Sequence, residues 1–432
     1  MKQITAHRGE IIHFLSHPNE NNKWSCQSFE DGLLVVEDGT IKAVGNANDL
    51  IIALPDSVEV IDHPNCLITP GFVDTHIHYP QCEVVASYGE QLLEWLETYT
   101  FPAEMKFSDP EHAALISKFF LDQLLLNGTT TALVFGTVHP QSVEAFFEEA
   151  QERNLRMICG KVMMDRNAPD ALLDTPESSY QESRDLIQKW HNKGRLRYAV
   201  TPRFAPTSTI EQLDSAGRLL REYPDVHFQT HLSENQKECE WVKALFPERD
   251  NYLDVYDHHQ LLGKRSLFAH GIHLDDTEWQ RLAETDSALS FCPSSNLFIG
   301  SGLFKYHKAK HFGVKTGLGT DVGGGDSFSI LRTINQAYKT EQLQGQRLSA
   351  FEALYLATLG GAKALDLDDK IGNFEKGKEA DFVILDYHAT ELMKFKTTYC
   401  DSISERLFSL LMLADDRAVK ETYILGNKHA KS

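Results

Sequence analysis

The sequence lacks any uncharged apolar run of the roughly 18 residues that a membrane-spanning helix needs. Its first residues do not lead into the apolar core of a secretory signal. Basic residues are scarce, since 42 Lys and Arg stand against 62 Asp and Glu, for a net charge of −20. Such a charge repels polyanions and argues against nucleic acid or an anionic membrane as a partner. These absences predict an acidic cytoplasmic enzyme.

The chain also lacks a Cys-x-x-Cys pair. Its cysteines are odd in number and widely spaced, which is typical of reduced structural thiols rather than a disulfide framework. Cys292, beside Pro293, suggests a nucleophile, but no paired base is identifiable, and an apolar filler at a strand end is the better interpretation. The seven cysteines are Cys26, Cys66, Cys82, Cys159, Cys239, Cys292 and Cys400.

Strand and helix patterns alternate through the middle of the chain. One helix is predicted to begin at Asp109 and Pro110, a cap followed by a first-turn proline. Eight apolar or β-branched runs separated by such helices predict a (β/α)8 barrel of the TIM type. The runs are residues 67–78, 130–137, 157–164, 196–204, 226–234, 266–274, 288–296 and 314–321.

Both chain ends contain short alternating runs bracketed by turn residues, for example 32–45 and 380–386. Neither end has enough strands for a stable sheet of its own. We therefore expect the ends to pair into one small β-sandwich domain. The predicted limits are 1–67 and 371–432 for this domain and 68–370 for the barrel, and 432 residues suffice for both.

The connection 79–107 is too long for an ordinary barrel loop and carries Tyr88, Trp95, Tyr99, Phe101 and Phe107. Long ordered loops in compact domains are often lids or binding loops. A lid over a flat aromatic ligand and a loop whose aromatics pack on the barrel or a partner subunit are both open interpretations.

His76 and His78 lie on one predicted strand, where alternation directs both imidazoles to the same face. Two such imidazoles can hold a metal, although His-x-His also occurs on exposed strands. His231, His270 and Asp321 each end a later run. Because the carboxyl ends of barrel strands meet at one face, we expect a single metal centre there.

Three imidazoles and a carboxylate, from His76, His78, His231 and Asp321, suit Zn²⁺ or Fe²⁺. Zinc lowers the pKa of a bound water to about 7, which makes hydroxide available near neutral pH. Glu234, three residues after His231, is placed to take the water's proton and return it to a leaving group. The alternative is an exposed loop carboxylate.

His270 should face the same space, as a further ligand or as an electrophilic partner of the attacking water. Asp321 has a competing interpretation as a turn residue, because Gly319 and the glycines at 323–325 surround it. No Gly-Lys-Ser/Thr follows those glycines, so they do not form a phosphate loop.

Arg203 and Phe204 end the fourth predicted strand. The arginine offers a rigid fork of donors and the phenylalanine a flat face, which suit a planar heterocycle that carries a carbonyl. Gln81 could donate to and accept from the edge of such a base. A salt-bridged rim arginine and an exposed glutamine are the alternatives.

These motifs resemble the metal-dependent amidohydrolase superfamily over nearly the whole chain. The general resemblance lies in residues 70–78, His231, His270, Asp321 and the closing segment 372–381. A narrower resemblance, to the branch whose members deaminate guanine, rests on Gln81 and on segments 99–104, 201–204, 231–234 and 295–302.

The resemblance implies that His76, His78, His231 and Asp321 are zinc ligands and that Glu234 is the proton shuttle. It assigns purine binding to Gln81, Arg203 and Phe204, and the steering of the nucleophile to His270 and Asp321. Several superfamily members hold two metals on a strand-four lysine, which residues 196–204 lack, so one zinc per subunit is expected. A homodimer that converts guanine to xanthine and ammonia is also implied.

Two other functions remain open from the sequence. The first is deamination or dechlorination of another heterocycle, such as a triazine, cytosine or an adenosine derivative. A fork of donors at Arg203 favours guanine over adenine, which lacks the carbonyl. The second is a non-catalytic purine-binding protein on the same barrel, because a fold does not guarantee activity.

Overall fold

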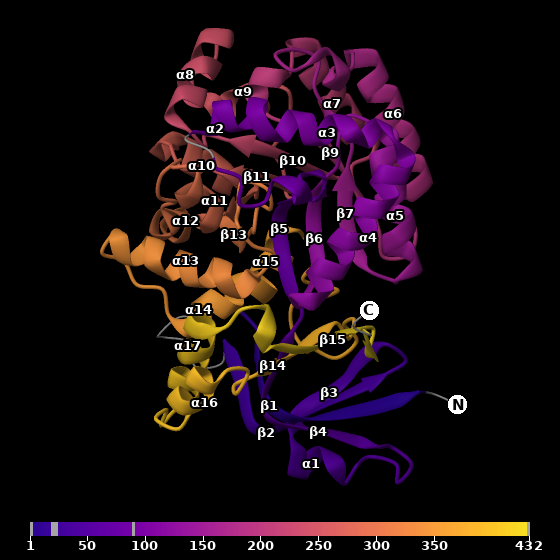
Figure 1. The fold of residues 1–432 in the computed structure, drawn as a ribbon, viewed down its shortest axis with the longest axis vertical. Helices are drawn as coiled ribbons and strands as arrows, with labels where there is room; N and C mark the ends of the chain where they lie inside the picture. The colour runs from indigo at the N-terminus through magenta and orange to yellow at the C-terminus, as the bar shows by residue number, and fades with distance from the viewer. Residues whose placement is uncertain (1–2, 19–24, 89–90, 430–432) are drawn as a thin grey trace. The chain divides into compact units, whose positions relative to one another are not determined.

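The computed structural model describes residues 3–18, 25–88 and 91–429. The chain divides into two compact units (Figure 1). One comprises Met1–Val73, Asp122–Thr130 and Ser329–Ser432, and the other Asp74–Leu121 and Thr131–Phe328. The domain limits predicted from the sequence were drawn where the strand and helix pattern changes, whereas these units are defined by compactness. The two divisions need not coincide, and the predicted limits stay a prediction.

Eight parallel strands form the barrel, with the short strand β8 beside β9. The hydrogen-bonded order runs from β13 through β12, β11, β10, β9, β7 and β6 to β5. The amides of Asp321 and His78 donate to the carbonyls of His76 and Val322, at 2.9 and 3.2 Å, and so link the chain after β13 to β5. The strands are β5 (Phe72–His78), β6 (Thr129–Phe135), β7 (Arg156–Gly160), β8 (Val162–Met163), β9 (Arg197–Pro202), β10 (His227–Leu232), β11 (Ser266–His270), β12 (Ala288–Phe291) and β13 (Lys315–Leu318).

The barrel strands are largely buried because both of their faces are covered. Every residue of β5, β6 and β7 is buried, as expected for parallel strands between a filled interior and a layer of helices. The (β/α)8 prediction is confirmed. The intervening helices are α4 (Pro110–Leu126), α5 (Pro140–Glu152), α6 (Pro176–Trp190), α7 (Ile210–Glu222), α8 (Gln236–Leu245), α9 (Tyr252–His258), α10 (Asp276–Glu284), α11 (Pro293–Phe298) and α12 (Tyr306–Phe312).

Capping residues set where several of these helices begin. Thr175 and Asp275 each accept a backbone N–H of the following turn and form capping boxes for α6 and α10. Helix α4 begins at Pro110, as predicted, and the amide of Glu111 donates to the Asp109 carboxylate at 2.9 Å.

Two predicted runs combine different elements. Residues 67–78 belong to β4 (Val60–Pro70) and β5, which lie in different sheets. An apolar run does not reveal where a chain passes from one sheet to another. In 288–296, the strand ends at Phe291, and the helix α11 begins at Pro293, a residue favoured in a first helical turn.

The segment 79–107 is largely helical rather than an open loop. Its described parts form η1 (Tyr79–Val84), α2 (Leu92–Trp95), η2 (Leu96–Thr100), α3 (Phe101–Met105) and η3 (Lys106–Ser108), while residues 89–90 lie outside the described residues. Leu92, Trp95 and Leu96 have the i, i+3, i+4 spacing of one helical face and are buried, whereas Tyr88 is 76% exposed. The prediction that this segment is a loop was therefore wrong.

The two chain ends form one sheet, as predicted. Its seven strands are hydrogen-bonded in the order β16-β15-β14-β4-β1-β2-β3, so the expected small β domain contains one continuous sheet. Its pairing shifts register between Gly9 and Ile11. The remaining elements are β1 (Ile4–Phe14), β2 (Cys26–Glu37), β3 (Thr40–Asn46), β14 (Phe382–Asp386), β15 (Val419–Ile424), β16 (Asn427–Lys428), α1 (Ala47–Ile51), α13 (Ile330–Leu343), α14 (Ala350–Tyr355), η6 (Leu356–Gly360), α15 (Gly361–Ala364), α16 (Glu391–Thr397), α17 (Ile403–Leu413) and η7 (Asp416–Ala418).

His13 on β1 makes the stability of this sheet sensitive to acid. Burial lowers its pKa to about 4, so the folded chain holds the neutral ring while the unfolded chain binds a proton below its ordinary pKa of about 6.5. The stabilisation is complete above pH 6.5 and is lost as the pH falls towards 4, by about 3 kcal/mol. Urea unfolding of the wild type and of His13→Gln across this range should show a flatter pH dependence in the variant. Parallel curves would contradict this expectation.

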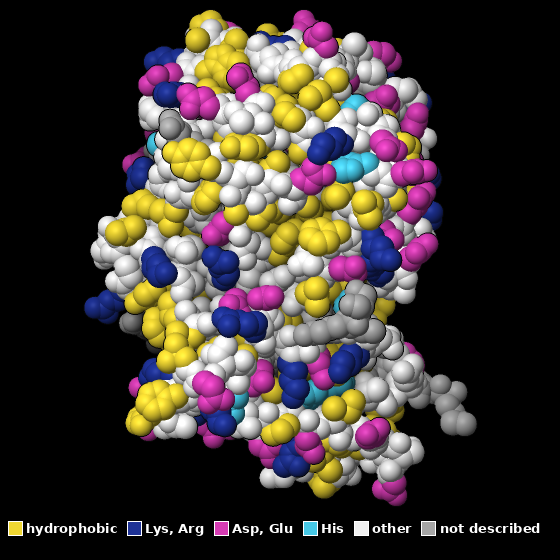
Figure 2. Space-filling model, in the orientation of Figure 1, with side chains coloured by type: hydrophobic (Ala, Val, Ile, Leu, Met, Phe, Trp, Pro, Cys, Tyr) yellow, Lys and Arg dark blue, Asp and Glu magenta, His cyan; other side chains and the backbone are white. Residues whose placement is uncertain are grey.

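Acidic and basic side chains are interspersed on the face shown in Figure 2. All seven cysteines are free thiols, as expected. Among the described helices, none is both long and apolar enough to span a membrane.

Candidate active site

Strand β5 delivers the histidine pair into the barrel. His76 and His78 are 0% and 2% exposed, and their ring centroids are 4.9 Å apart. The buried Asp74 carboxylate accepts the amides of His76 and Thr320, at 3.2 and 3.1 Å, together with the Thr320 hydroxyl. Burial raises the pKa of Asp74 to about 7, although these donors oppose the shift. Asp74 thereby fastens β5 to the segment that carries Asp321.

Two site residues adopt left-handed backbone conformations. Asp321, just after β13, has φ of 50°, and His270, at the end of β11, has φ of 72°. Ser233, beside Glu234, has φ of 48°. Non-glycine residues rarely adopt this conformation, which costs about 1–3 kcal/mol and concentrates at functional sites. At the ends of three strands the backbone therefore adopts an unfavourable conformation, which directs the side chains of site residues.

Three of the distances between the four predicted ligands fit one metal ion. His78 Nε2 lies 3.2 Å from His231 Nε2, and Asp321 Oδ1 lies 3.2 Å from His76 Nε2 and 3.5 Å from His78 Nε2. Ligand atoms about 2.05 Å from a tetrahedral zinc are separated by about 3.3 Å. Among the described residues, His76, His78 and Asp321 form one cluster able to hold a metal, and His76, His231 and His270 form another. The two clusters share His76, and His231 and Asp321 fall in different ones.

The ring nitrogens of this cluster support the same interpretation. Both nitrogens of His76 and Nδ1 of His78 are buried and have no hydrogen-bond partner among the described residues. His231 Nδ1 lies 2.7 Å from the Arg203 carbonyl, so the proton belongs on Nδ1 and the lone pair of Nε2 faces the cluster. Burial, with the neighbouring positive charges, lowers the pKa values of His76 and His231 to about 3 and keeps their rings neutral. Neutral imidazoles without other partners are suited to bind a metal.

Glu234 lies beside this cluster on the chain after β10 and is 2% exposed. Burial raises its pKa well above the ordinary range, and repulsion from Asp321 and Glu238 adds to the effect. Its Oε1 accepts the Ser301 hydroxyl at 3.0 Å, and its Oε2 lies 3.4 Å from His270 Nε2. A carboxyl group that can hold a proton near neutral pH is suited to acid–base chemistry.

His270 is fully buried between the shuttle candidate and the ligand cluster. Its Nε2 lies 3.8 Å from Asp321 Oδ2, and its Nδ1 lies 2.9 Å from the Asn296 side-chain nitrogen. An amide N–H donated to Nδ1 places the ring proton on Nε2. In that tautomer Nε2 is a donor, which favours the electrophilic role of His270 over that of a ligand.

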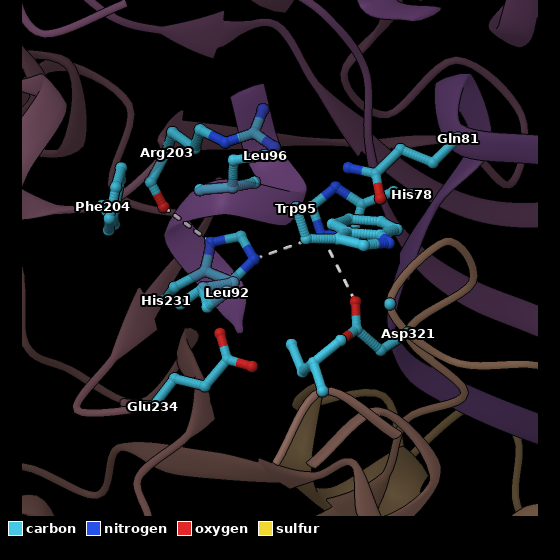
Figure 3. A pocket seen from close by; sticks show the side chains of 12 residues that line it. His78, Gln81, Leu92, Trp95, Leu96, Arg203, Phe204, His231, Glu234 and Asp321 are labelled. Atoms are coloured by element: carbon cyan, nitrogen blue, oxygen red, sulfur yellow. Dashed lines mark hydrogen bonds and ion pairs between the residues drawn. The ribbon is translucent and has the colours of Figure 1, made fainter. Parts of the chain in front are cut away.

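A cavity lies beside the cluster (Figure 3). Its apolar wall comes from Leu92, Trp95, Leu96, Phe204 and Ile299, and its polar lining includes Gln81, Arg203, Glu234 and Asp321. The mixture of flat apolar walls with a few polar groups suits a small planar ligand.

The helical segment α2–η2 is held over this cavity. At its start, the Gln91 side-chain oxygen accepts the Asn235 amide at 3.2 Å, next to Glu234. Of the aromatic residues noted in 79–107, Trp95 lines the cavity, and Phe101 and Phe107 are buried. The segment thus supplies a wall of the site as well as packing.

The Arg203 guanidinium is paired with a buried carboxylate. Its Nη1 contacts both oxygens of the buried Glu104 carboxylate, at 2.9 and 2.7 Å, and the same carboxylate accepts Gln81 Nε2 at 3.1 Å. The ring of Phe101 lies 5.6 Å from the Arg203 guanidinium carbon.

Sequence reasoning missed four residues of this site, namely Asp74, Glu104, Asn296 and Ser301. All four lie inside the motifs that carry the family resemblance, and a carboxylate two residues before His-x-His was a usable signal for Asp74. The role of Glu104 has no local signal, because its partner is 99 positions away. Cys292 is buried, and burial raises its thiol pKa well above the ordinary range, consistent with an apolar filler.

Comparison with known proteins places this geometry in a family. Residues 67–428 match the Amidohydrolase family. The chain is 57% identical to guanine deaminase of Escherichia coli K12 over 99% of this chain and 97% of that one. A structure of E. coli guanine deaminase superposes with a TM-score of 0.95 at 54% identity, covering 99% of both chains. Guanine deaminase from C. acetobutylicum, crystallised with bound guanine, gives 0.90 at 30% identity, covering 99% of this chain and 100% of that one. The chain therefore belongs to the amidohydrolase family, in its guanine deaminase branch.

Proposed function

We propose that this chain hydrolyses guanine to xanthine and ammonia. The observation that carries the proposal is a buried cluster of metal-ligand type, with the proton-holding carboxyl of Glu234 beside it, at the floor of a cavity lined by Arg203 and Phe204. The relatives named as guanine deaminases, one of them with guanine bound, support the choice of substrate.

His76, His78, His231 and Asp321 would hold one zinc ion, and an Fe²⁺ ion suits the same donors. When bound, the metal supplies a Lewis acid that lowers the pKa of a coordinated water. The absence of lysine from β9 supports a single ion. The resemblance to the family also leads us to propose that the protein is a cytoplasmic homodimer. Its ligand would be a small purine, and we propose that it binds neither nucleic acid nor a membrane.

Glu234 would move the protons of the reaction. Its Oε1 is engaged by Ser301, so Oε2 is the atom left to take a proton from the attacking water. That proton passes to the ring nitrogen next to C2 as the water oxygen bonds to C2. When the C2–amine bond breaks, Glu234 takes the remaining proton from the new C2–OH group and delivers it to the departing nitrogen, and ammonia and xanthine result. His270 Nε2–H would steer the attacking oxygen.

Arg203 and Phe204 would hold the purine. The guanidinium donates towards the 6-oxygen, while Phe204, with Trp95 and Leu96, encloses the ring faces. A direct test is product analysis after incubation with guanine, for which we expect xanthine and ammonia in equal amounts. Absence of xanthine would overturn the proposal.

Arg203→Ala should lower kcat/KM for guanine by about 100- to 1000-fold, because the carbonyl loses its donor in a buried site. The metal content should stay unchanged, since the side chain is not a proposed ligand. Arg197→Ala, at the opposite end of β9, serves as the control. Loss of the metal in Arg203→Ala, or unchanged turnover, would refute the assignment.

A further inference from the structure

We propose that Glu104 is a positioning residue that sets the guanine specificity of the cavity by fixing the Arg203 guanidinium and the Gln81 amide in one hydrogen-bonded arrangement. The inference rests on the proposed function. Glu104 lies on α3 (Phe101–Met105), is 0% exposed, and has no other role in the reaction described above.

The contact leaves most of the arginine's donors free. Nη1 alone contacts the two Glu104 oxygens, so Nε and Nη2 retain three N–H groups. Among the described residues, the hydrogen bonds of the Arg203 side chain run from Nη1 to Glu104, and Arg203 lines the cavity. The carboxylate therefore holds one corner of the guanidinium and leaves its other edge for a carbonyl oxygen of the ligand.

The same carboxylate orients the Gln81 amide. An ionised carboxylate can only accept hydrogen bonds, so the Gln81 NH₂ group must face Glu104 and its carbonyl must point elsewhere. The carbonyl oxygen packs against Gly323, where a Cβ atom would approach it to 2.2 Å. Gly323, at φ of 101°, thus gives the amide space for this one orientation.

The resulting pattern of donors and acceptors is specific. Arg203 offers donors only, and Gln81 offers an acceptor, which together complement a purine edge with a keto oxygen beside a ring N–H. An adenine edge presents an amino group beside a ring acceptor and leaves both protein groups unpaired. Glu104 determines the pattern without contacting the ligand.

Glu104 also balances charge. An unpaired buried guanidinium is strongly unfavourable, and Arg203 is 2% exposed. The carboxylate neutralises the arginine, while Phe101, on the same short helix, lies over its guanidinium. Arg203 is thus held from two sides by one segment.

The test compares guanine with 2-aminopurine, which carries the same leaving amine but lacks the 6-oxygen. Glu104→Gln keeps the shape but removes the charge and introduces an NH₂ that opposes Arg203 and Gln81. We expect kcat/KM for guanine to fall about 100-fold, because small displacements of positioning groups have effects of this size. The value for 2-aminopurine should change by less than about 3-fold. Glu97→Gln, exposed on η2, is the matched control.

Two further variants separate positioning from folding. Glu104→Asp retains the charge and should show a smaller loss with the same substrate pattern. Adding Glu104→Gln to Arg203→Ala should cost little further guanine activity, since the two residues act through one contact. Equal losses for both substrates with a lower melting temperature, unchanged discrimination, or additive losses would overturn the inference. A wild-type chain that releases no ammonia from guanine would instead overturn the proposed function.

Discussion

Replacing Glu234 by glutamine is expected to reduce ammonia release from guanine by about 10²- to 10⁴-fold, the range typical of a lost general acid–base. The glutamine amide keeps the size of the side chain and can still accept the Ser301 hydroxyl, but it cannot take or return a proton. Because Glu234 is not among the proposed ligands, metal content should not change.

Binding of the purine separates loss of chemistry from loss of the site. The affinity of Glu234→Gln for guanine, measured by calorimetry, should stay within about tenfold of the wild type, since one hydrogen-bonding group is exchanged for another. Glu240→Gln, an exposed carboxylate on α8, is the matched control. Substantial surviving turnover in Glu234→Gln would exclude Glu234 as the proton shuttle.

Removing a metal ligand should have an effect at least as large. His231→Ala deletes one imidazole and leaves His78 Nε2 without the neighbouring nitrogen that lies 3.2 Å away in the wild type. We expect less than about a tenth of the wild-type metal content, because even outer-shell changes lower metal affinity by 10–100-fold. Guanine turnover should fall to background.

The control for this variant is His258→Ala, an exposed histidine on α9. Added Zn²⁺ at high concentration should restore little activity to His231→Ala but full activity to a chelator-treated wild type. If His231→Ala kept its metal and its turnover, the ligand set would be wrong.

The fold was predictable because the barrel strands are buried on both faces. A run such as Thr129–Phe135, entirely apolar or threonine, indicates a covered parallel strand. The same property hides the ends of strands. Within such runs the only local signals are Pro70 and Gly71 at the passage between two sheets, and Pro293 at the first turn of the helix within 288–296.

The convergence of the site residues followed from topology. Once His76, His231, His270 and Asp321 were placed at carboxyl ends of barrel strands, the fold brought them to one face. Their supporting partners were harder to predict. Asn296 lay in a run interpreted as a strand, and Glu104 lay in a segment interpreted as a loop, so the direction of neither side chain could be predicted from its local sequence. Such partners are fixed by long-range packing, which a single sequence does not encode at adjacent positions.

The most direct test of the central claim is ammonia release by the purified, metal-analysed protein from guanine, adenine, cytosine and a chlorotriazine, with chloride release also measured for the chlorotriazine, side by side with and without a strong chelator. The account predicts ammonia from guanine alone, lost when the metal is removed and restored when zinc is returned. Ammonia from another of these substrates in preference to guanine, or guanine turnover that persists after complete removal of the metal, would contradict it.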